Sequence, residues 1–308
     1  MSDASLAKAP VHDTPVHVIG TSGKSGQALI RRLLADGIAV VPVVRSPDWQ
    51  PPAAFGDDPR LAPVRRADLG DAAAMAAALA DASRIVNTAH ARHTASLLAA
   101  APASARLVLL GSTRRFTRFP DTLAHEIAAG ETAFLASRRP GVMLHPTMIY
   151  WASGEENVQR LAAMLRRLPF LPLPNGGRSL LQPIHQDDVT RSIRAALAIP
   201  WTAPESLVIA GAEAVTYADF ARAVAAAAGL SPPRIVSVPA GPLMLAAWLT
   251  TRLPTRLPLS LRASPAEIRR LLEDKAFPVE SMAARLGIRP LGLAEGLART
   301  FPAVKMAL

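Results

Sequence analysis

Three glycines spaced three residues apart follow a short apolar segment near the start of the chain. Residues 16–19 read Val-His-Val-Ile, and the next seven residues form the pattern G-x-x-G-x-x-G. Such a turn carries a strand directly into a helix and lets backbone N–H groups approach a pyrophosphate, which the positive end of the helix dipole also favours. The alternative is an ordinary strand-to-helix loop, because one glycine-rich turn is a weak signal. The pattern predicts a dinucleotide-phosphate site at Gly20, Thr21, Ser22, Gly23, Lys24, Ser25 and Gly26.

Arg45 follows the next apolar run, Ala39–Val44. A nearly continuous apolar run is expected of a parallel strand that is buried on both faces. NAD-specific sites usually place an acidic residue at the end of this strand, whereas the 2′-phosphate of NADP needs a cation. We therefore predict NADP as the cofactor in preference to NAD, with Lys24 as an assisting cation.

Composition limits the class of protein. With 308 residues the chain can form a core domain with a smaller second domain, and its lack of cysteine excludes disulfides, thiolate metal sites and a cysteine nucleophile. The net charge of +10 is carried mainly by scattered arginine pairs inside helical patterns. We therefore expect no specific nucleic-acid partner, and the excess charge favours anionic ligands. No metal site is predicted.

Targeting signals are not evident. Residues 1–14 contain two aspartates and no apolar core of a signal peptide. The longest apolar stretch, Gly241–Leu249, is far shorter than the ~20 residues that a membrane-spanning helix needs. We expect a flexible N-terminus over residues 1–14, a cytoplasmic protein and no membrane span.

The elements that must position the glycine-rich turn alternate between strand and helix. Such alternation predicts a Rossmann-type doubly wound parallel sheet with helices on both faces. The expected strands are Val16–Ile19, Ala39–Val44, Ala62–Arg65, Arg84–Asn87, Arg106–Leu110 and Val142–His145. The expected helices are Gln27–Asp36, Asp71–Ala80, Ala91–Ala100 and Leu123–Ser137, with Asp71 as the N-cap of the second.

The pattern changes after Tyr150. Residues 169–177 contain three prolines and two glycines and cannot form a regular helix. Further on we expect a helix from Asp187 or Asp188 to Ile199, a helix over Thr216–Gly229, and short strands at Leu207–Ala210 and Ile235–Val238. We predict a Rossmann domain over residues 15–150 and 186–211, and a smaller C-terminal α/β substrate or partner domain over 151–185 and 212–308.

The sequence resembles the extended and atypical branch of the short-chain dehydrogenase/reductase superfamily, the NAD(P)-dependent epimerase/dehydratase-like proteins. The resemblance spans nearly the whole chain and depends on the order in which short motifs occur. Besides the glycine turn these motifs are 67–69 (ADL), 87–90 (NTAH), 111–113 (GST), 145–150 (HPTMIY), 182–188 (QPIHQDD) and 210–216 (AGAEAVT).

The resemblance implies further cofactor contacts. Asp68 and Leu69 would flank the adenine, although Asp68 could instead be an ordinary loop or helix-start carboxylate. The segment Thr88, Ala89 and His90 would face the ribose and pyrophosphate, and His145, Pro146 and Thr147 the nicotinamide end.

The family's Tyr-x-x-x-Lys pair is absent. Alignment of the fourth helix through Gly130 and Glu131 places Leu123 and Ile127 at these positions, and neither side chain can titrate. The arginine that nucleotide-sugar enzymes carry before the QPIHQDD histidine is Leu181 here, which makes a nucleotide-sugar substrate less expected. The remaining catalytic candidates are Ser112, His125 and Tyr150. Each has a structural alternative: a backbone-bonded hydroxyl, a polar helix face and a packed core residue, respectively.

The loop Ser112–Pro120 alternates arginines with two phenylalanines. It could hold an anionic planar ligand or a partner through Arg114, Arg115 and Arg118, or it could be a solvated loop. Two functions therefore stay open. One is an NAD(P)-binding protein of the reductase type, which either acts on a small-molecule substrate with a non-standard proton donor or is catalytically silent. The other is a cofactor-dependent regulatory or assembly factor that binds a protein partner.

Overall fold

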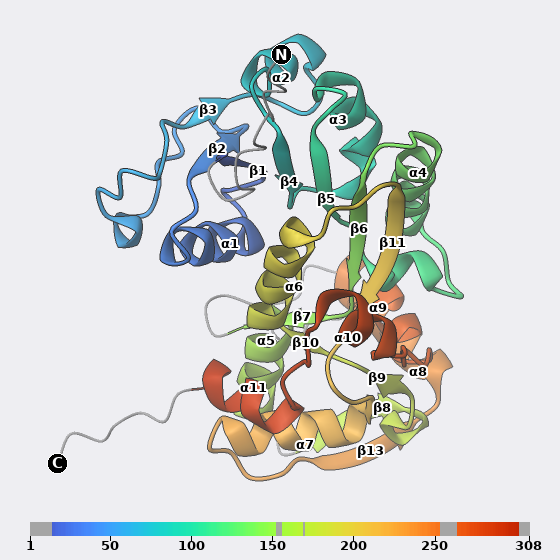
Figure 1. Ribbon diagram of the computed structural model, residues 1–308. Helices are drawn as coiled ribbons and strands as arrows, with labels where there is room; N and C mark the ends of the chain where they lie inside the picture. Colours follow the sequence, from blue (N-terminus) through green and yellow to red (C-terminus); the bar gives the residue numbers. More distant parts are fainter. Residues whose placement is uncertain (1–13, 152–155, 169, 253–263, 302–308) are drawn as a thin grey trace, which may run out of the picture. The chain divides into compact units, whose positions relative to one another are not determined.

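The computed structural model describes residues 14–151, 156–168, 170–252 and 264–301 (Figure 1). The chain forms two compact units, each made of three chain segments. Within the described residues, unit 1 contains 14–112, 125–145 and 190–207, and unit 2 contains 113–124, 146–189 and 208–301. The N-terminus that we expect to be flexible lies, apart from Thr14, outside the described residues. Residues 113–124, which the sequence analysis assigned to the Rossmann domain, belong to unit 2.

Unit 1 is built on a seven-stranded sheet with the order β11-β6-β5-β4-β1-β2-β3. All pairs from β6 to β3 are parallel. The strand bounds are β1 Val16–Ile19, β2 Val40–Val44, β3 Arg65–Arg66, β4 Arg84–Asn87, β5 Arg106–Leu110, β6 Gly141–Pro146 and β11 Pro204–Ile209. Because β1 stands between β2 and β4, the strand order reverses there, and α/β proteins bind ligands beside such a point. The predicted Rossmann-type fold is confirmed.

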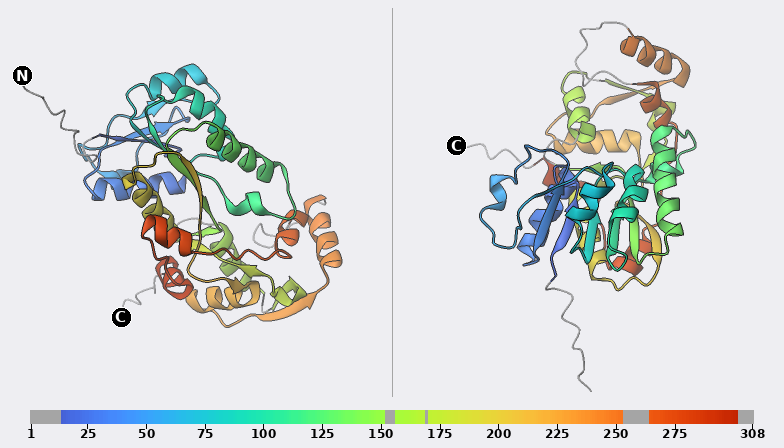
Figure 2. Two further views of the ribbon diagram at one scale, coloured as in Figure 1. Left: turned by 45° about the vertical axis from the view of Figure 1, so that its right-hand side comes forward. Right: turned by 90° about the horizontal axis from the view of Figure 1, so that it is seen from above.

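Helices cover both faces of this sheet (Figure 2). Buried side chains of Met75, Leu97 and Phe134 place α2, α3 and α4 over one face. On the other face α1 packs against β1 and β2, and the Arg194–Asp36 ion pair (2.9 Å) ties α6 to the end of α1. The helix bounds are α1 Lys24–Ala35, α2 Ala72–Ala78, α3 Thr94–Ala100, α4 Thr122–Ala136 and α6 Gln186–Ala198.

Most expected elements are present, and the differences have local causes. Asp71 caps α2 by accepting the N–H of Ala74. The third strand is only two residues long and begins at Arg65, because Pro63 has no N–H to donate to a sheet. The expected helix Ala91–Ala100 begins as a 3-10 turn, η2 (Ala91–His93), before it becomes α3.

Unit 2 contains small two-stranded sheets and short helices. Strand β7 (Ile149–Tyr150) pairs with β10 (Ile184–His185), β8 (Phe170–Pro174) with β13 (Arg234–Val238), and β9 (Leu180–Leu181) with β12 (Val215–Thr216). The helices are α5 Glu156–Leu165, α7 Tyr217–Ala227, α8 Ala240–Arg252, α9 Pro265–Arg270, α10 Glu280–Leu286 and α11 Leu293–Thr300. Residues 170–177 form β8 and a 3-10 turn and not a regular helix, in agreement with the prediction from the prolines; residue 169 lies outside the described residues.

The described part of the chain has neither a membrane-spanning helix nor a metal-binding cluster. None of its helices has the length and apolarity needed to cross a membrane. No three of its His, Asp and Glu side chains gather into a group that could hold a metal ion.

The packing of α4 makes a prediction about stability. A Cβ on Gly130 would overlap the carbonyl of Ala91, whereas a Cβ on Gly241, near the start of α8, would meet nothing within 4 Å. We expect Gly130→Ala to lower the free energy of unfolding by about 1–3 kcal/mol because overpacked sites must shift. Gly241→Ala should leave it unchanged or raise it by up to about 1 kcal/mol through helix propensity. Urea unfolding followed by circular dichroism measures both, and equal effects of the two substitutions would contradict the prediction.

Candidate functional site

The turn after β1 is fixed by glycine. Gly20 has a φ of +82°, and a Cβ there would lie 2.8 Å from both the backbone nitrogen of Ala89 and the Oγ1 of Thr88. A Cβ on Gly26 would overlap the carbonyl oxygen of Gly20. The first glycine therefore permits the turn and the approach to β4, and the third permits α1 to pack against the turn.

Helix α1 presents its positive end to this turn. Its N-cap is Gly23, which has no side chain to accept a backbone N–H, and its first turn contains no acidic residue. The N–H of Gly23 donates to the carbonyl of Gly20 (3.0 Å) and closes the loop. A helix start without a capping side chain or a carboxylate is suited to bind an anion.

The end of β4 lies directly beside the turn. The backbone N–H and the hydroxyl of Thr88 both donate to the carbonyl of Ile19, at 2.9 Å each. The N–H of Ala89 donates to the Oδ1 of Asn87 (3.0 Å). The two bonds from Thr88 hold the loop after β4 against the end of β1, at the point where the strand order reverses.

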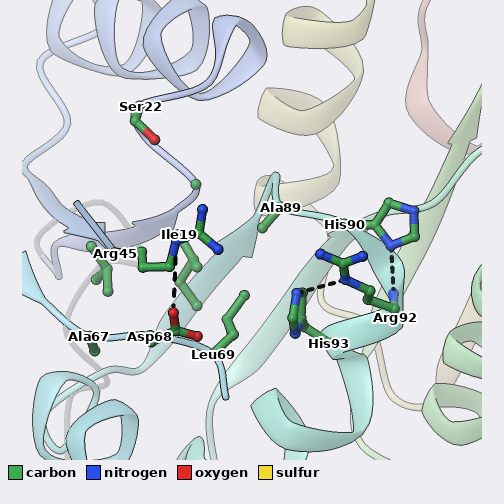
Figure 3. Close-up of a pocket in the computed structure, with 12 residues that line it drawn as sticks. Ile19, Ser22, Arg45, Ala67, Asp68, Leu69, Ala89, His90, Arg92 and His93 are labelled. Carbon is green, nitrogen blue, oxygen red and sulfur yellow. Dashed lines mark hydrogen bonds and ion pairs between the residues drawn. The ribbon is translucent and has the colours of Figure 1, made fainter. Parts of the chain in front are cut away.

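A pocket of about 220 Å³ opens at these strand ends (Figure 3). Its walls come from the ends of β1, β2 and β4 and from the loop after β3. The residues that line it are Ile19, Gly20, Ser22, Val43, Arg45, Ala67, Asp68, Leu69, Ala89, His90, Arg92 and His93.

Arg45 and Asp68 face each other across one side of the pocket (Figure 3). The Nε of Arg45 lies 3.8 Å from the Oδ2 of Asp68, and the Arg45 side chain is 76% exposed. The other oxygen of Asp68 accepts the N–H of Gly70 (2.7 Å), which orients the carboxylate. Since the ion pair is long and exposed, it holds Arg45 only weakly and leaves its guanidinium accessible to a ligand.

Arg92 and His93 form a second basic wall that the sequence analysis did not identify. The Nε of Arg92 donates to the Nε2 of His93 (3.1 Å). Burial lowers the pKa of His93, and the charge of Arg92 lowers it further, so the neutral ring can accept this bond. Both residues lie in η2, one turn after β4. Their position directly after the NTAH motif was the signal that could have found them.

His90 caps this turn. Its Nδ1 accepts the N–H of Arg92 (3.1 Å) and lies 3.8 Å from a carboxylate oxygen of Glu126. Burial lowers the pKa of His90. Its Nε2 is buried without a hydrogen-bond partner among the described residues, which leaves one polar atom of the pocket wall to be satisfied by a ligand or water.

The structure thus brings together seven of the predicted cofactor residues in the wall of one pocket: Gly20, Ser22, Arg45, Asp68, Leu69, Ala89 and His90. The other predicted residues are not among those that line it. Thr21 is fully buried, Thr88 supports the backbone, and Lys24 is exposed at the start of α1. Pro146 and Thr147 belong to unit 2.

Ser112 and His145 are linked at the ends of β5 and β6. The N–H of Ser112 donates to the Nδ1 of His145 (3.1 Å), and the Nε2 of His145 lies 3.3 Å from Glu131, which also accepts the Ser206 hydroxyl. His145 is fully buried, so its side chain positions the backbone of Ser112. Ser112 itself is half-buried.

The other catalytic candidates lie in different surroundings. His125 is exposed on α4. Tyr150 is 1% exposed within the core of unit 2, and burial raises the pKa of its phenol, which favours the packing alternative over proton transfer. Leu123 is half-buried and Ile127 is 3% exposed, so neither side chain is fully exposed.

The loop of arginines lies in unit 2. Arg114 forms an ion pair with Asp121, Arg115 stacks on the ring of Phe116 (4.6 Å), and Arg118 donates its backbone N–H to Glu273.

Comparison with known proteins agrees with this geometry. Residues 20–118 match the model of a family described as NAD(P)H-binding. The chain contains an NAD(P)H-binding domain. The match covers the glycine turn and every residue that lines the pocket except Ile19, which lies one residue before its start. No curated protein matches the chain.

Solved structures share the fold at low sequence identity. One is the NADPH-dependent quinone oxidoreductase QOR2 from Escherichia coli, complexed with NADPH (TM-score 0.70, 18% identity, 93% of this chain and 99% of that one). Another is a nucleoside-diphosphate-sugar epimerase from Staphylococcus aureus (0.69, 17%, 92% and 99%). A third is MoeE5 in complex with UDP-glucose and NAD (0.66, 19%, 94% and 97%). The expected resemblance is confirmed for the NAD(P)H-binding domain and for the fold.

The middle glycine provides a test of the phosphate turn. Gly23 has an allowed φ of −79°, so alanine fits its backbone, but the added methyl would stand 3.2 Å from the carbonyl of Gly20 at the start of α1. We expect Gly23→Ala to weaken NADPH binding at least tenfold in calorimetric titration, since the methyl keeps a phosphate away from the helix start.

Gly292→Ala is the matched control. Gly292 is also an extended N-cap, of α11, and its added Cβ would meet nothing within 4 Å. It should keep the NADPH affinity of the unchanged chain. Loss of affinity in both variants would assign the effect to general destabilisation instead.

Proposed function

We propose that unit 1 binds NADP(H) in preference to NAD(H), and that the chain is an oxidoreductase of the atypical short-chain reductase type. The observation that carries the cofactor preference is the exposed guanidinium of Arg45 at the end of β2, in the wall of the pocket. A charge-assisted contact with the 2′-phosphate would replace its long contact with Asp68.

The pocket residues fit the parts of such a cofactor. The pyrophosphate would lie at the uncapped start of α1, and the adenine between Leu69 and the loop after β4. Arg92 would add a second cation to the adenosine side. The structural neighbours support both cofactors, since QOR2 is complexed with NADPH and MoeE5 with NAD. The preference therefore depends on Arg45 and on the absence of an acidic residue at the end of β2.

For the reaction, the bound cofactor would supply or accept a hydride, and the chain would supply orientation and proton transfer. Ser112 is the candidate hydrogen-bond donor to a substrate carbonyl, because His145 fixes its backbone at the end of β5. His125 is the candidate proton donor in place of the missing tyrosine. The substrate would be a small carbonyl or quinone compound.

The cofactor preference is tested by Arg45→Asp. We expect NADPH affinity to fall by about 10- to 150-fold, corresponding to ~1.5–3 kcal/mol for a hydrogen bond to a charged group, while NADH affinity changes little. Arg106→Asp is the charge-matched control, because Arg106 begins β5 and so lies at the opposite end of the strand from the site. Calorimetric titration of both variants with both cofactors gives four affinities, each of which is compared with that of the unchanged chain. Equal losses for NADPH and NADH in Arg45→Asp would show that Arg45 is structural.

The enzymatic proposal is tested by turnover. We expect the purified protein to oxidise NADPH with at least one member of a panel of aldehydes, ketones, enones and quinones. Ser112→Ala should lower kcat at least tenfold while NADPH affinity stays the same, because the hydroxyl is proposed to bind the substrate carbonyl and not the cofactor. Binding of NADPH without turnover on the whole panel, together with stoichiometric capture of a protein partner, would favour the regulatory or assembly factor and reject the reductase.

A further inference from the structure

Unit 2 contains a cavity of its own, of about 270 Å³, between the loop that follows β5 and the segment from α9 to Lys275. Five of its lining residues are cationic and one is acidic. The residues around it are Arg114, Thr117, Arg118, Phe119, Pro120, Asp121, Ala266, Arg269, Arg270 and Lys275.

The cations outnumber the carboxylates that could neutralise them. Asp121 pairs with Arg114, and Glu273, behind the wall, lies 3.5 Å from Lys275. Among the described residues, Arg118, Arg269 and Arg270 take part in no ion pair within 4.0 Å. Three guanidinium groups around one small cavity therefore have no carboxylate in direct contact, although Glu267 and Asp121 lie near enough to Arg270 to oppose the lowering of its pKa.

These charges are close enough to act on one another. The pKa of Arg270 is lowered by burial and next by the charge of Arg114. Burial also lowers the pKa of Lys275, where Glu273 opposes the shift and Arg270 and Arg114 add to it. Holding partly desolvated like charges together is unfavourable unless an anion joins them.

The cavity walls are held in place by other contacts. The carboxylate of Glu273 is 3% exposed and accepts the hydroxyl of Thr117 (2.8 Å) and the N–H of Arg118. These bonds fasten the loop to the opposite segment. On that segment, Ser264 and Glu267 form a capping box at the start of α9, and Glu267 also pairs with Arg160 (2.9 Å).

We propose that this cavity is a binding site for a compact, multiply charged phosphate anion, such as inorganic pyrophosphate or the phosphorylated end of a small metabolite. Arginine forks match phosphate oxygens in geometry and keep their charge. The volume admits a small anion and not a nucleic-acid strand, and Phe119 is the one aromatic side chain among the residues that line the cavity. The site is built only from residues of unit 2 and does not depend on the proposed cofactor preference.

The test uses the full chain and calorimetric titration with inorganic pyrophosphate. We expect saturable binding at low ionic strength that weakens as salt is added, because the charges are partly exposed. Arg270→Gln and Arg118→Gln should each weaken it at least fivefold. Arg234→Gln, an exposed arginine of β13 outside the cavity, should not. The Arg118 variant is the safer of the two, since its side chain is exposed and makes no described contact.

Further titrations distinguish binding at this cavity from binding at the dinucleotide pocket. They also distinguish phosphate anions from other anions. Gly23→Ala should keep pyrophosphate binding, and Arg118→Gln should keep NADPH binding. Binding that is lost in Gly23→Ala and kept in both arginine variants would place pyrophosphate in the dinucleotide pocket and overturn the proposal. So would no binding at millimolar pyrophosphate. Equally tight binding of citrate, with the same loss in Arg118→Gln, would overturn the assignment to phosphate chemistry.

Discussion

The close approach of three backbone segments at Gly20 determines most of what unit 1 can bind. The turn after β1, the start of α1 and the loop after β4 meet where no side chain fits, since a Cβ on Gly20 or Gly26 would strike backbone or Thr88. Because of this contact, the N-terminus of α1 and the ends of β1 and β4 border one space. A larger residue at either glycine would separate these segments and remove the surface on which a pyrophosphate could lie.

Around that contact, the pocket wall contains more positive than negative side chains. Arg45 and Arg92 both reach the pocket, while Asp68 is oriented by the N–H of Gly70 and lies 3.8 Å from the Nε of Arg45, beyond hydrogen-bonding distance. An exposed, long ion pair contributes little to stability. Arg45 is therefore available for a ligand at small energetic cost, and Asp68 can orient it before a ligand arrives. The neutral ring of His93 completes this basic wall by accepting a bond from Arg92.

The parts of this protein that follow local rules could be predicted from the sequence. Strands buried on both faces read as apolar runs, so β1, β4 and β5 were placed at their observed bounds, and the glycine spacing located the turn. Contacts between distant residues could not be predicted. Glu273 lies about 155 residues from the loop it holds, and nothing near Lys275 in the sequence indicates that it faces Arg114. His145 was predicted from a motif as a cofactor residue, and its side chain is buried against Glu131. A motif gives the position of a residue and not the direction of its side chain, so this contact could not be predicted.

The discontinuity of unit 1 has a consequence for how the chain is made. Strand β11 pairs at the edge of the sheet next to β6, although residues 146–189 of unit 2 separate the two strands in the sequence. During synthesis β6 would therefore present an unpaired edge, and Glu131 would lack the hydroxyl of Ser206, until more than fifty further residues had emerged. Unpaired edges and late long-range contacts slow folding and favour association between chains. Unit 1 can be completed only after residues 113–124 and 146–189 of unit 2 have been synthesised, so the two units are coupled in the order of their folding as well as by the covalent chain.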